Sequence, residues 1–296
     1  MSRIQDILSK AERDGTMRRT RALPDDGRPA RAVAALAREA YSAPPPPWTA
    51  EATAPALLDV PDQAPRLAPS AQLDASLVAA SASHSLAAEQ FRALRTRIKR
   101  AENGRAMRTI VITSPAKGDG KSLTAANLAL TMAQEYQQRV LIVDADLRRP
   151  TVHRLFGIAD GPGLADVLMG GAVLDDALVM MPDHHLSILP AGALPHHPAE
   201  LLGSAAMRRL LDTLRSRYDR IIIDMPPVAP LADLHIVAPL VDGVLMIVRA
   251  GVTPKPAIER ALAGLDTAKV LGLVLNETGG RAADRHTYEG YGYLAG

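Results

Sequence analysis

Ser114-Pro-Ala-Lys-Gly-Asp-Gly-Lys-Ser122 follows the aliphatic run Thr109–Thr113 and precedes the amphipathic stretch Leu123–Gln138. A strand, a glycine-containing loop and a helix, in that order, form the arrangement that a phosphate-binding loop requires. Gly118 and Gly120 allow the backbone to turn tightly, so that successive N–H groups face inward and attract an anion. The N-terminal end of the following helix adds its positive partial charge. This stretch therefore predicts nucleotide binding at the end of a buried strand.

The loop departs from the strict pattern G-x-x-x-x-G-K-[ST], because Pro115 stands where that pattern has its first glycine. An ordinary glycine turn stays an alternative, since short glycine motifs also arise by chance. The remaining match assigns Lys121 to the terminal phosphates and the Ser122 hydroxyl to Mg²⁺. Lys117 either reaches a phosphate or is a solvated lysine on the rim. The expected nucleotide contacts in the loop are Ala116, Lys117, Gly118, Asp119, Gly120, Lys121, Ser122 and Leu123.

Two further aliphatic runs end in aspartates. Val140–Val143 leads into Asp144 and Asp146, and Ile221–Ile223 leads into Asp224 and two prolines. Residues two apart in an extended chain point the same way, so the first two carboxylates should face the site together. Neighbouring carboxylates are unfavourable unless a cation or a hydroxyl donor lies between them. A solvated turn is the alternative for this pair, although the apolar run before it favours a site.

The chain from Ser85 onward alternates strand-like and helical runs. Further strands are predicted at Leu186–Leu189, Val244–Val248 and Leu271–Leu275, and further helices at Ala199–Tyr218 and Pro256–Leu265. Continuous aliphatic strands separated by helices are typical of a parallel sheet that is covered on both faces. We therefore expect an α/β fold of the P-loop NTPase type, with a mainly parallel sheet.

The N-terminal region has a different composition. Ser2–Arg13 carries apolar residues at helical spacing and predicts a short amphipathic helix, which is either solvated or docks on a partner or a membrane surface. Pro44–Pro47 begins a Pro/Ala-rich stretch with too few large apolar side chains to offset the entropy of ordering. The expected organisation is a largely disordered region at 1–84, a P-loop domain at 85–280 and a flexible tail at 281–296.

Composition excludes several classes of protein. The chain has no cysteine, which excludes disulfides, thiolate metal sites and cysteine nucleophiles. Its formal net charge is +2, and the basic run from Arg92 to Arg108 has almost no interleaved aromatic side chains beyond the adjacent Phe91, so we expect no nucleic-acid partner. No apolar run approaches the roughly 18 residues of a membrane span, and no signal peptide is visible. We expect a cytoplasmic protein.

Together these motifs resemble those of the bacterial tyrosine kinases, the BY-kinase family, which belongs to the deviant-Walker group that includes the MinD/ParA ATPases. Ser114–Ser122 resembles the Walker A motif, Val143-Asp144-Ala-Asp146-Leu-Arg148 the Walker A′ motif, and Ile221–Pro227 the Walker B motif. Asn276 matches a position that often contacts adenine in this group. The resemblance implies ATP and Mg²⁺ as cofactors. It implies a metal site of Ser122, Asp146 and Asp224 and catalytic roles for Lys121, Asp144, Asp146 and Asp224.

The resemblance extends to the two ends of the domain. Glu89-x-x-Arg92-x-x-Arg95 is similar to the family's oligomerisation motif, and Tyr288, Tyr291 and Tyr293 are similar to its C-terminal tyrosine cluster. This similarity implies tyrosine phosphorylation in trans within a homo-oligomer that regulates capsule or exopolysaccharide polymerisation and export. It further implies a membrane-bound activator of the chain-length-determinant type, which recruits the chain to the inner face of the plasma membrane, and a cognate phosphotyrosine phosphatase.

Two questions stay open from the sequence. We expect Asp144 to orient the hydroxyl of the incoming tyrosine or to accept its proton, but its role and that of Asp146 could be reversed, since spacing alone does not fix which carboxylate faces the metal. The chain could also be a MinD/ParA-type ATPase, a nucleotide-switched positioning dimer that transfers phosphate only to water. Against this alternative, the second-position lysine of such ATPases falls here on Ala116, and their C-terminal amphipathic membrane helix has no counterpart.

Overall fold

The computed structural model describes residues 66–67, 73–102, 104, 106–135, 138–228, 233–266 and 269–278. These residues lie in one compact unit. The predicted amphipathic helix, the Pro/Ala-rich stretch and the three tail tyrosines lie outside the described residues. No helix in the described ranges combines the length and the apolarity needed to cross a bilayer.

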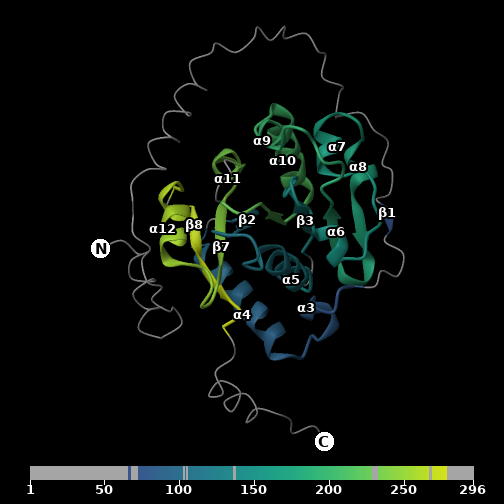
Figure 1. Ribbon diagram of the computed structural model, residues 1–296. Coiled ribbons are helices and arrows are strands. Elements are labelled where there is room, and N and C mark those ends of the chain that lie inside the picture. Colours follow the sequence, from purple (N-terminus) through teal and green to yellow (C-terminus); the bar gives the residue numbers. More distant parts are fainter. Residues whose placement is uncertain are drawn as a thin grey trace, which may run out of the picture. The chain divides into compact units, whose positions relative to one another are not determined.

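The described residues form an eight-stranded sheet in the order β1-β4-β5-β3-β6-β2-β7-β8 (Figure 1). Neighbouring strands are parallel except β4 and β5, which are antiparallel. The strands are β1 (Arg66–Leu67), β2 (Thr109–Thr113), β3 (Val140–Asp144), β4 (Val179–Met181), β5 (Leu186–Leu189), β6 (Arg220–Asp224), β7 (Gly243–Arg249) and β8 (Val270–Asn276). The mainly parallel sheet is thus confirmed, and all six predicted strands are present. The two that were not predicted, β1 and β4, are too short to show a period.

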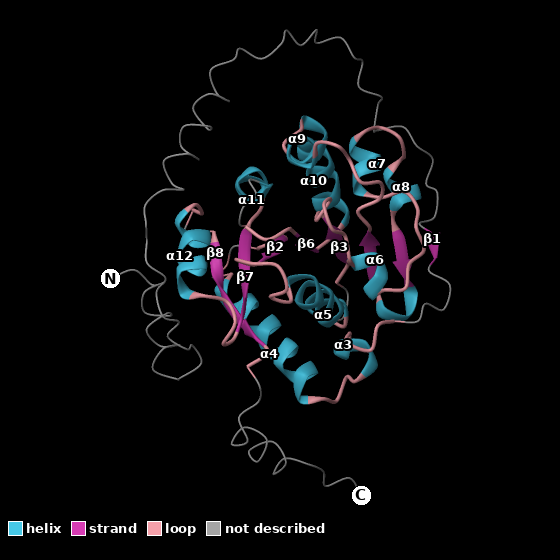
Figure 2. Cartoon of the chain, viewed as in Figure 1, coloured by secondary structure: helices cyan, strands magenta, loops and turns pink. Residues whose placement is uncertain are grey.

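Helices cover both faces of the sheet, as predicted (Figure 2). One face packs against α3 (Val78–Ser81), α4 (Leu86–Ala101), α5 (Lys121–Ala133) and α6 (Val152–Leu155). The other packs against α7 (Leu164–Leu168), α8 (Leu174–Ala177), α9 (Pro198–Leu202), α10 (Ala205–Arg217), α11 (Asp233–Val237) and α12 (Lys255–Ala263). Alternate residues of a strand pack into hydrophobic cores on opposite faces of the sheet. In β2, Ile110 and Ile112 pack on the face covered by α5, and Val111 packs on the face covered by α10.

Two predicted boundaries differ from the structure. The stretch Ala199–Tyr218 is two helices, because α9 ends at Leu202, before Gly203, and Ser204 caps α10 by accepting the Met207 N–H at 3.2 Å. A serine that caps a new helix interrupts a pattern that is otherwise continuous. The packed part of the chain also begins before the expected boundary at Ser85, since Leu77 is fully buried and the Ala79 N–H donates to Asn127 Oδ1 at 3.0 Å.

Candidate active site

The three motifs meet at the carboxyl ends of β3, β6 and β2, which are adjacent in the sheet. Asp144 and Asp224 are paired directly in the register of β3 and β6, and Asp224 is paired with Ile112 of β2 on its other side. The loop that starts at Ser114 therefore leaves the sheet beside both aspartates. Carboxyl ends of parallel strands are the edge at which α/β proteins bind ligands. The topology thus brings together residues that are far apart in the sequence.

The phosphate loop has the backbone that an anion site needs. Gly118 and Gly120 have φ angles of 87° and 91°, a region that side chains rarely adopt. A Cβ on Gly120 would also lie 2.1 Å from Asn276 Nδ2, so a larger residue here would displace the Asn276 side chain. Gly120 precedes the 13-residue helix α5 without a side-chain cap, which leaves the first N–H groups of that helix available to an anion.

Asp119 is a structural residue of this loop. The residue is 2% exposed, and its Oδ2 accepts the Ala116 N–H at 3.0 Å. Oδ1 accepts the Thr253 hydroxyl at 2.7 Å, and the Asp119 carbonyl accepts Asn276 Nδ2–H at 3.0 Å. Thr253 was missed by sequence reasoning, because it lies 134 residues from its partner in an unremarkable turn. Asn276 lies against the loop, and its contact with adenine stays a prediction.

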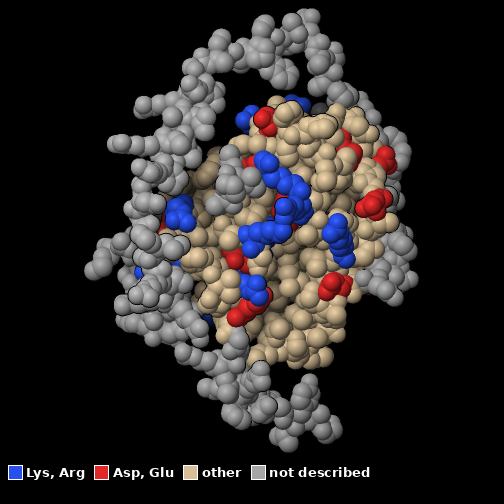
Figure 3. Space-filling model, viewed as in Figure 1, with Lys and Arg blue, Asp and Glu red and all other residues tan. Residues whose placement is uncertain are grey.

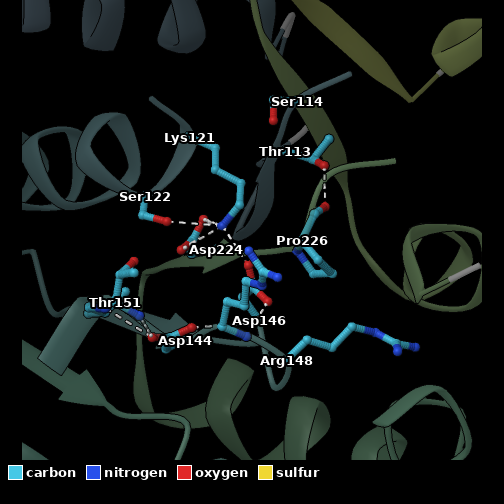
Figure 4. Close-up of polar contacts among 12 residues, drawn as sticks. Thr113, Ser114, Lys121, Ser122, Asp144, Asp146, Arg148, Thr151, Asp224 and Pro226 are labelled. Carbon is cyan, nitrogen blue, oxygen red and sulfur yellow. Dashed lines mark hydrogen bonds and ion pairs between the residues drawn. The ribbon is translucent and has the colours of Figure 1, made fainter. Parts of the chain in front are cut away.

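Lys121 points into the group of predicted metal ligands (Figure 4). Its Nζ lies 2.9 Å from Asp146 Oδ2, 3.0 Å from Ser122 Oγ and 3.3 Å from Asp224 Oδ1. Burial lowers the pKa of Lys121, but the charges of Asp224 and Asp146 outweigh it and hold that pKa above its ordinary value. One cation therefore already sits where the three oxygen ligands converge.

This donor set fits Mg²⁺. Carboxylate and hydroxyl oxygens are the ligands that a hard cation prefers, and Ser122, Asp146 and Asp224 surround a single point. Within the described ranges no group of three or more His, Cys, Asp or Glu residues has metal-site geometry. A metal at this point would therefore rest on two carboxylates, one hydroxyl and oxygens from phosphate or water.

Asp144 has different surroundings from Asp146. It is fully buried, its Oδ2 accepts the N–H groups of Thr151 and Val152, both at 3.0 Å, and its Oδ1 accepts the Asp146 N–H at 3.2 Å. Burial, reinforced by the charge of Asp224, raises the pKa of Asp144 to about 7. Burial also raises the pKa of Asp224, against the opposing charge of Lys121. Asp144 thus shapes the loop that carries Asp146, and it is Asp146 that contacts Lys121.

Arg148, the last residue of the Walker A′-like motif, anchors this loop to α11. Its Nε and Nη2 donate to Asp233 Oδ2 and Oδ1 at 2.8 and 3.1 Å, and the Asp233 side chain is 1% exposed. Asp233 was not predicted, since nothing local distinguishes it from a solvated aspartate at a helix start. Figure 3 shows that Lys and Arg side chains gather near the centre of the viewed face, between the positions of α11 and α6. Such a surface favours an anionic ligand.

The remaining predicted residues lie apart from this centre. On α4, Arg92 pairs with Glu89, and Arg95 donates to the Thr131 carbonyl at 2.7 Å and pairs with Glu135 at 3.4 Å, so both arginines have partners in their own chain. Lys117 is exposed on the rim of the loop. A cavity of about 650 Å³ between α4 and β8 touches Leu123 and Asn276 but none of the site carboxylates.

Comparison with known proteins agrees with this geometry. Residues 107–252 match a family model described as an AAA domain. The tyrosine-protein kinase YwqD of Bacillus subtilis is 37% identical over 222 residues, which cover 74% of this chain and 92% of YwqD. The succinoglycan biosynthesis transport protein ExoP of Rhizobium meliloti is 35% identical over 208 residues, which cover 69% of this chain and 26% of ExoP.

A solved structure shares both fold and sequence. The kinase domain of the Escherichia coli tyrosine kinase ETK superposes with a TM-score of 0.65 at 30% identity, over 68% of this chain and 79% of that domain. The chain thus spans nearly all of YwqD but about a quarter of ExoP. On this likeness, and with the three motifs at one edge of the sheet, the chain belongs to the family of bacterial tyrosine kinases.

Proposed function

We propose that the chain transfers the γ-phosphoryl group of ATP to tyrosines of its own C-terminal segment, in trans within a homo-oligomer. The convergence of Lys121, Ser122, Asp146 and Asp224 on one point is the observation that carries this proposal. Phosphoryl transfer depends on positioning and charge neutralisation more than on covalent chemistry. A phosphate loop beside two buried aspartates supplies both.

Nucleotide binding uses the backbone and Lys121. The N–H groups from Gly118 to Ser122 hold the phosphates, and the Lys121 ammonium leaves the two aspartates for the β- and γ-phosphates. Ser122, Asp146 and Asp224 are then free to hold Mg²⁺, which neutralises charge on the phosphates when bound. The hydrogen bonds of Asp119 to Ala116 and Thr253 hold the loop in the shape that the phosphates need.

We assign the orientation of the acceptor tyrosine to the Walker A′-like loop. Asp146 Oδ1 accepts the Arg149 N–H at 3.0 Å, but its Oδ2 is released when Lys121 moves to the phosphates. Both Asp144 oxygens, by contrast, accept backbone N–H groups that stay in place, so the contacts favour Asp146 over Asp144 as the carboxylate that orients the tyrosine hydroxyl. In the transfer, the bond from phosphorus to the bridging oxygen of ADP breaks as the bond to the tyrosine oxygen forms. The phenolic proton passes to the carboxylate or to water.

The acceptors we propose are Tyr288, Tyr291 and Tyr293, beside glycines in the last nine residues of the chain. Each transfer adds about −1.5 to −2 charge to a tail, so that neighbouring tails repel and the oligomer loosens. Glu89, Arg92 and Arg95 would form the contact between subunits. The name of ExoP, a succinoglycan biosynthesis transport protein, supports a role in exopolysaccharide production and export. A membrane-bound activator and a phosphotyrosine phosphatase complete the proposed cycle, which takes place in the cytoplasm at the membrane.

Incubation of the purified full chain with Mg²⁺ and ATP, followed by phosphotyrosine detection, tests the proposal. The activator's cytoplasmic segment is added in a parallel sample. Wild-type protein should gain phosphotyrosine in at least one condition, and Lys121→Met should gain none. ATP hydrolysis without phosphotyrosine in both conditions would favour the MinD/ParA-type ATPase instead.

A further inference from the structure

The hydroxyl of Thr151 is a buried polar group that the site described above leaves unused. Thr151 follows the Walker A′-like loop and immediately precedes α6. Its Oγ1 is inaccessible to solvent and has no hydrogen-bond partner among the described residues. A buried hydroxyl without a partner is destabilising, so it is expected to have one in some state of the protein.

The Thr151 side chain does not cap α6, although a threonine at this position ordinarily would. A threonine before a helix usually accepts a backbone N–H of the first turn, but the Thr151 side chain makes no such bond. The Asp144 carboxylate takes that role instead, accepting the N–H groups of Thr151 and Val152, each at 3.0 Å. The hydroxyl is therefore free for another partner, while its backbone is fixed beside Asp144.

The orientation of the side chain identifies the direction of that partner. In Figure 4 the Thr151 hydroxyl points away from the Asp144 carboxylate and toward the side on which Ser122 and Asp224 lie. Those two residues belong to the proposed metal site. Mg²⁺ demands six oxygens and keeps several waters when it binds few carboxylates, and those waters donate hydrogen bonds to nearby acceptors.

We propose that Thr151 Oγ1 accepts a hydrogen bond from a water of the Mg²⁺ coordination shell and so acts as a positioning residue for the metal. The inference rests on the proposed function in one respect, the presence of Mg²⁺ between Ser122, Asp146 and Asp224. It does not depend on which group accepts the phosphoryl. Loss of the hydroxyl should weaken Mg²⁺ binding about three- to tenfold, as expected for one hydrogen bond in the outer shell of a metal.

The test compares Thr151→Val, which replaces the hydroxyl by a methyl group, with Thr151→Ser, which keeps it. A fluorescent ADP analogue is bound to each full-length protein in EDTA, and Mg²⁺ is then titrated into the complex. We expect equal ADP affinity in EDTA for all three proteins, a Mg²⁺ midpoint about three- to tenfold higher for the valine variant, and a wild-type midpoint for the serine variant.

Thermal melting in EDTA supplies a second readout. Because the hydroxyl has no partner among the described residues, Thr151→Val should melt at or above the wild-type temperature in EDTA. A lower melting temperature for this variant alone would overturn the proposal by showing a structural bond. A wild-type Mg²⁺ midpoint in Thr151→Val, with a loss only in KM for a tyrosine peptide, would overturn it in favour of an acceptor contact. Wild-type protein whose ADP binding ignores Mg²⁺ would refute the metal site itself and the proposal with it.

Discussion

Lys121 Nζ lies 2.9 Å from Asp146 Oδ2, so the lysine that we propose as a phosphate ligand neutralises a carboxylate of the proposed metal site. The ammonium and a divalent cation cannot occupy this point together, because both need the same oxygens. We therefore expect binding of the nucleotide and of the metal to be coupled through Lys121. On the proposed function, phosphates would draw the lysine away, and its departure would expose the metal ligands.

This coupling predicts opposite effects of Lys121→Met on two ligands. Nucleotide affinity should fall at least tenfold, because the charge on the terminal phosphates is lost. Affinity for Mn²⁺ in the absence of nucleotide should rise, because Asp146 and Asp224 lose their resident cation. Isothermal titration calorimetry measures both. Lys117→Met, on the exposed rim, is the matched control and should leave Mn²⁺ binding unchanged. Unaltered Mn²⁺ affinity in Lys121→Met would contradict the claim that the Lys121 ammonium and the metal occupy the same point.

The raised pKa of Asp144 predicts a dependence of stability on pH. The folded-state pKa is about 7 against 3.8 in the unfolded chain, so between these values the folded state binds the additional proton. The contribution of Asp144 to the free energy of unfolding is therefore greatest below about pH 4, and it is lost as the pH rises through 7. The free energy of unfolding, measured with urea in EDTA, should decline less steeply with rising pH for Asp144→Asn than for wild-type protein. Part of the decline should persist, because the pKa of Asp224 is also raised.

Asp183→Asn is the control for this experiment, since Asp183 is exposed and its substitution should leave the pH profile of wild-type protein intact. Asp144→Asn should also unfold at lower urea at every pH, because one amide group cannot accept from the N–H groups on both sides of the original carboxylate. An unchanged profile in Asp144→Asn would show that this carboxyl is ionised throughout the range.

The hydrogen bond from Thr253 to Asp119 predicts that a residue outside every recognised motif controls nucleotide affinity. Thr253→Val removes a donor from the buried Asp119 Oδ1 and an acceptor from the Arg249 N–H. The unpaired groups should destabilise the protein by about 1–3 kcal/mol. The loosened loop should lower ATP affinity severalfold. Fluorescence titration and thermal melting follow the two effects, and Thr253→Ser should restore both. Wild-type affinity in the valine variant would show that the loop holds its shape without this bond.

Most of this site could be predicted from the sequence, because each of its motifs lies next to a strand that is recognisable from its own residues. Strands β2, β3 and β6 are buried on both faces, so each appears as a continuous aliphatic run, and each motif follows directly from one of them. The parallel order then places the motifs together. The missed residues are those whose role depends on a distant partner. Thr253 lies 134 residues from Asp119, and Asp233 lies 85 residues from Arg148.

The contact between Arg148 and Asp233 leads to a further prediction. Arg148→Ala leaves the buried Asp233 carboxylate without its bidentate partner, and the loop that bears Asp146 loses its anchor on α11. Phosphoryl transfer should fall about tenfold or more with smaller changes in ATP affinity, as measured by separate kcat and binding assays. Arg149→Ala, one residue away and exposed, is the control. Equal effects of the two substitutions would assign the loss to surface charge, not to the anchor.

The most direct test of the central claim is mass spectrometry of the full chain after incubation with Mg²⁺ and ATP, with and without the cytoplasmic segment of the proposed membrane-bound activator. The account predicts phosphate on Tyr288, Tyr291 and Tyr293 of wild-type protein and on none of them in Lys121→Met. Replacement of the three tyrosines by phenylalanine should remove most of the phosphotyrosine while ATP binding persists. Active wild-type protein that consumes ATP while these three tyrosines stay unmodified would contradict the account.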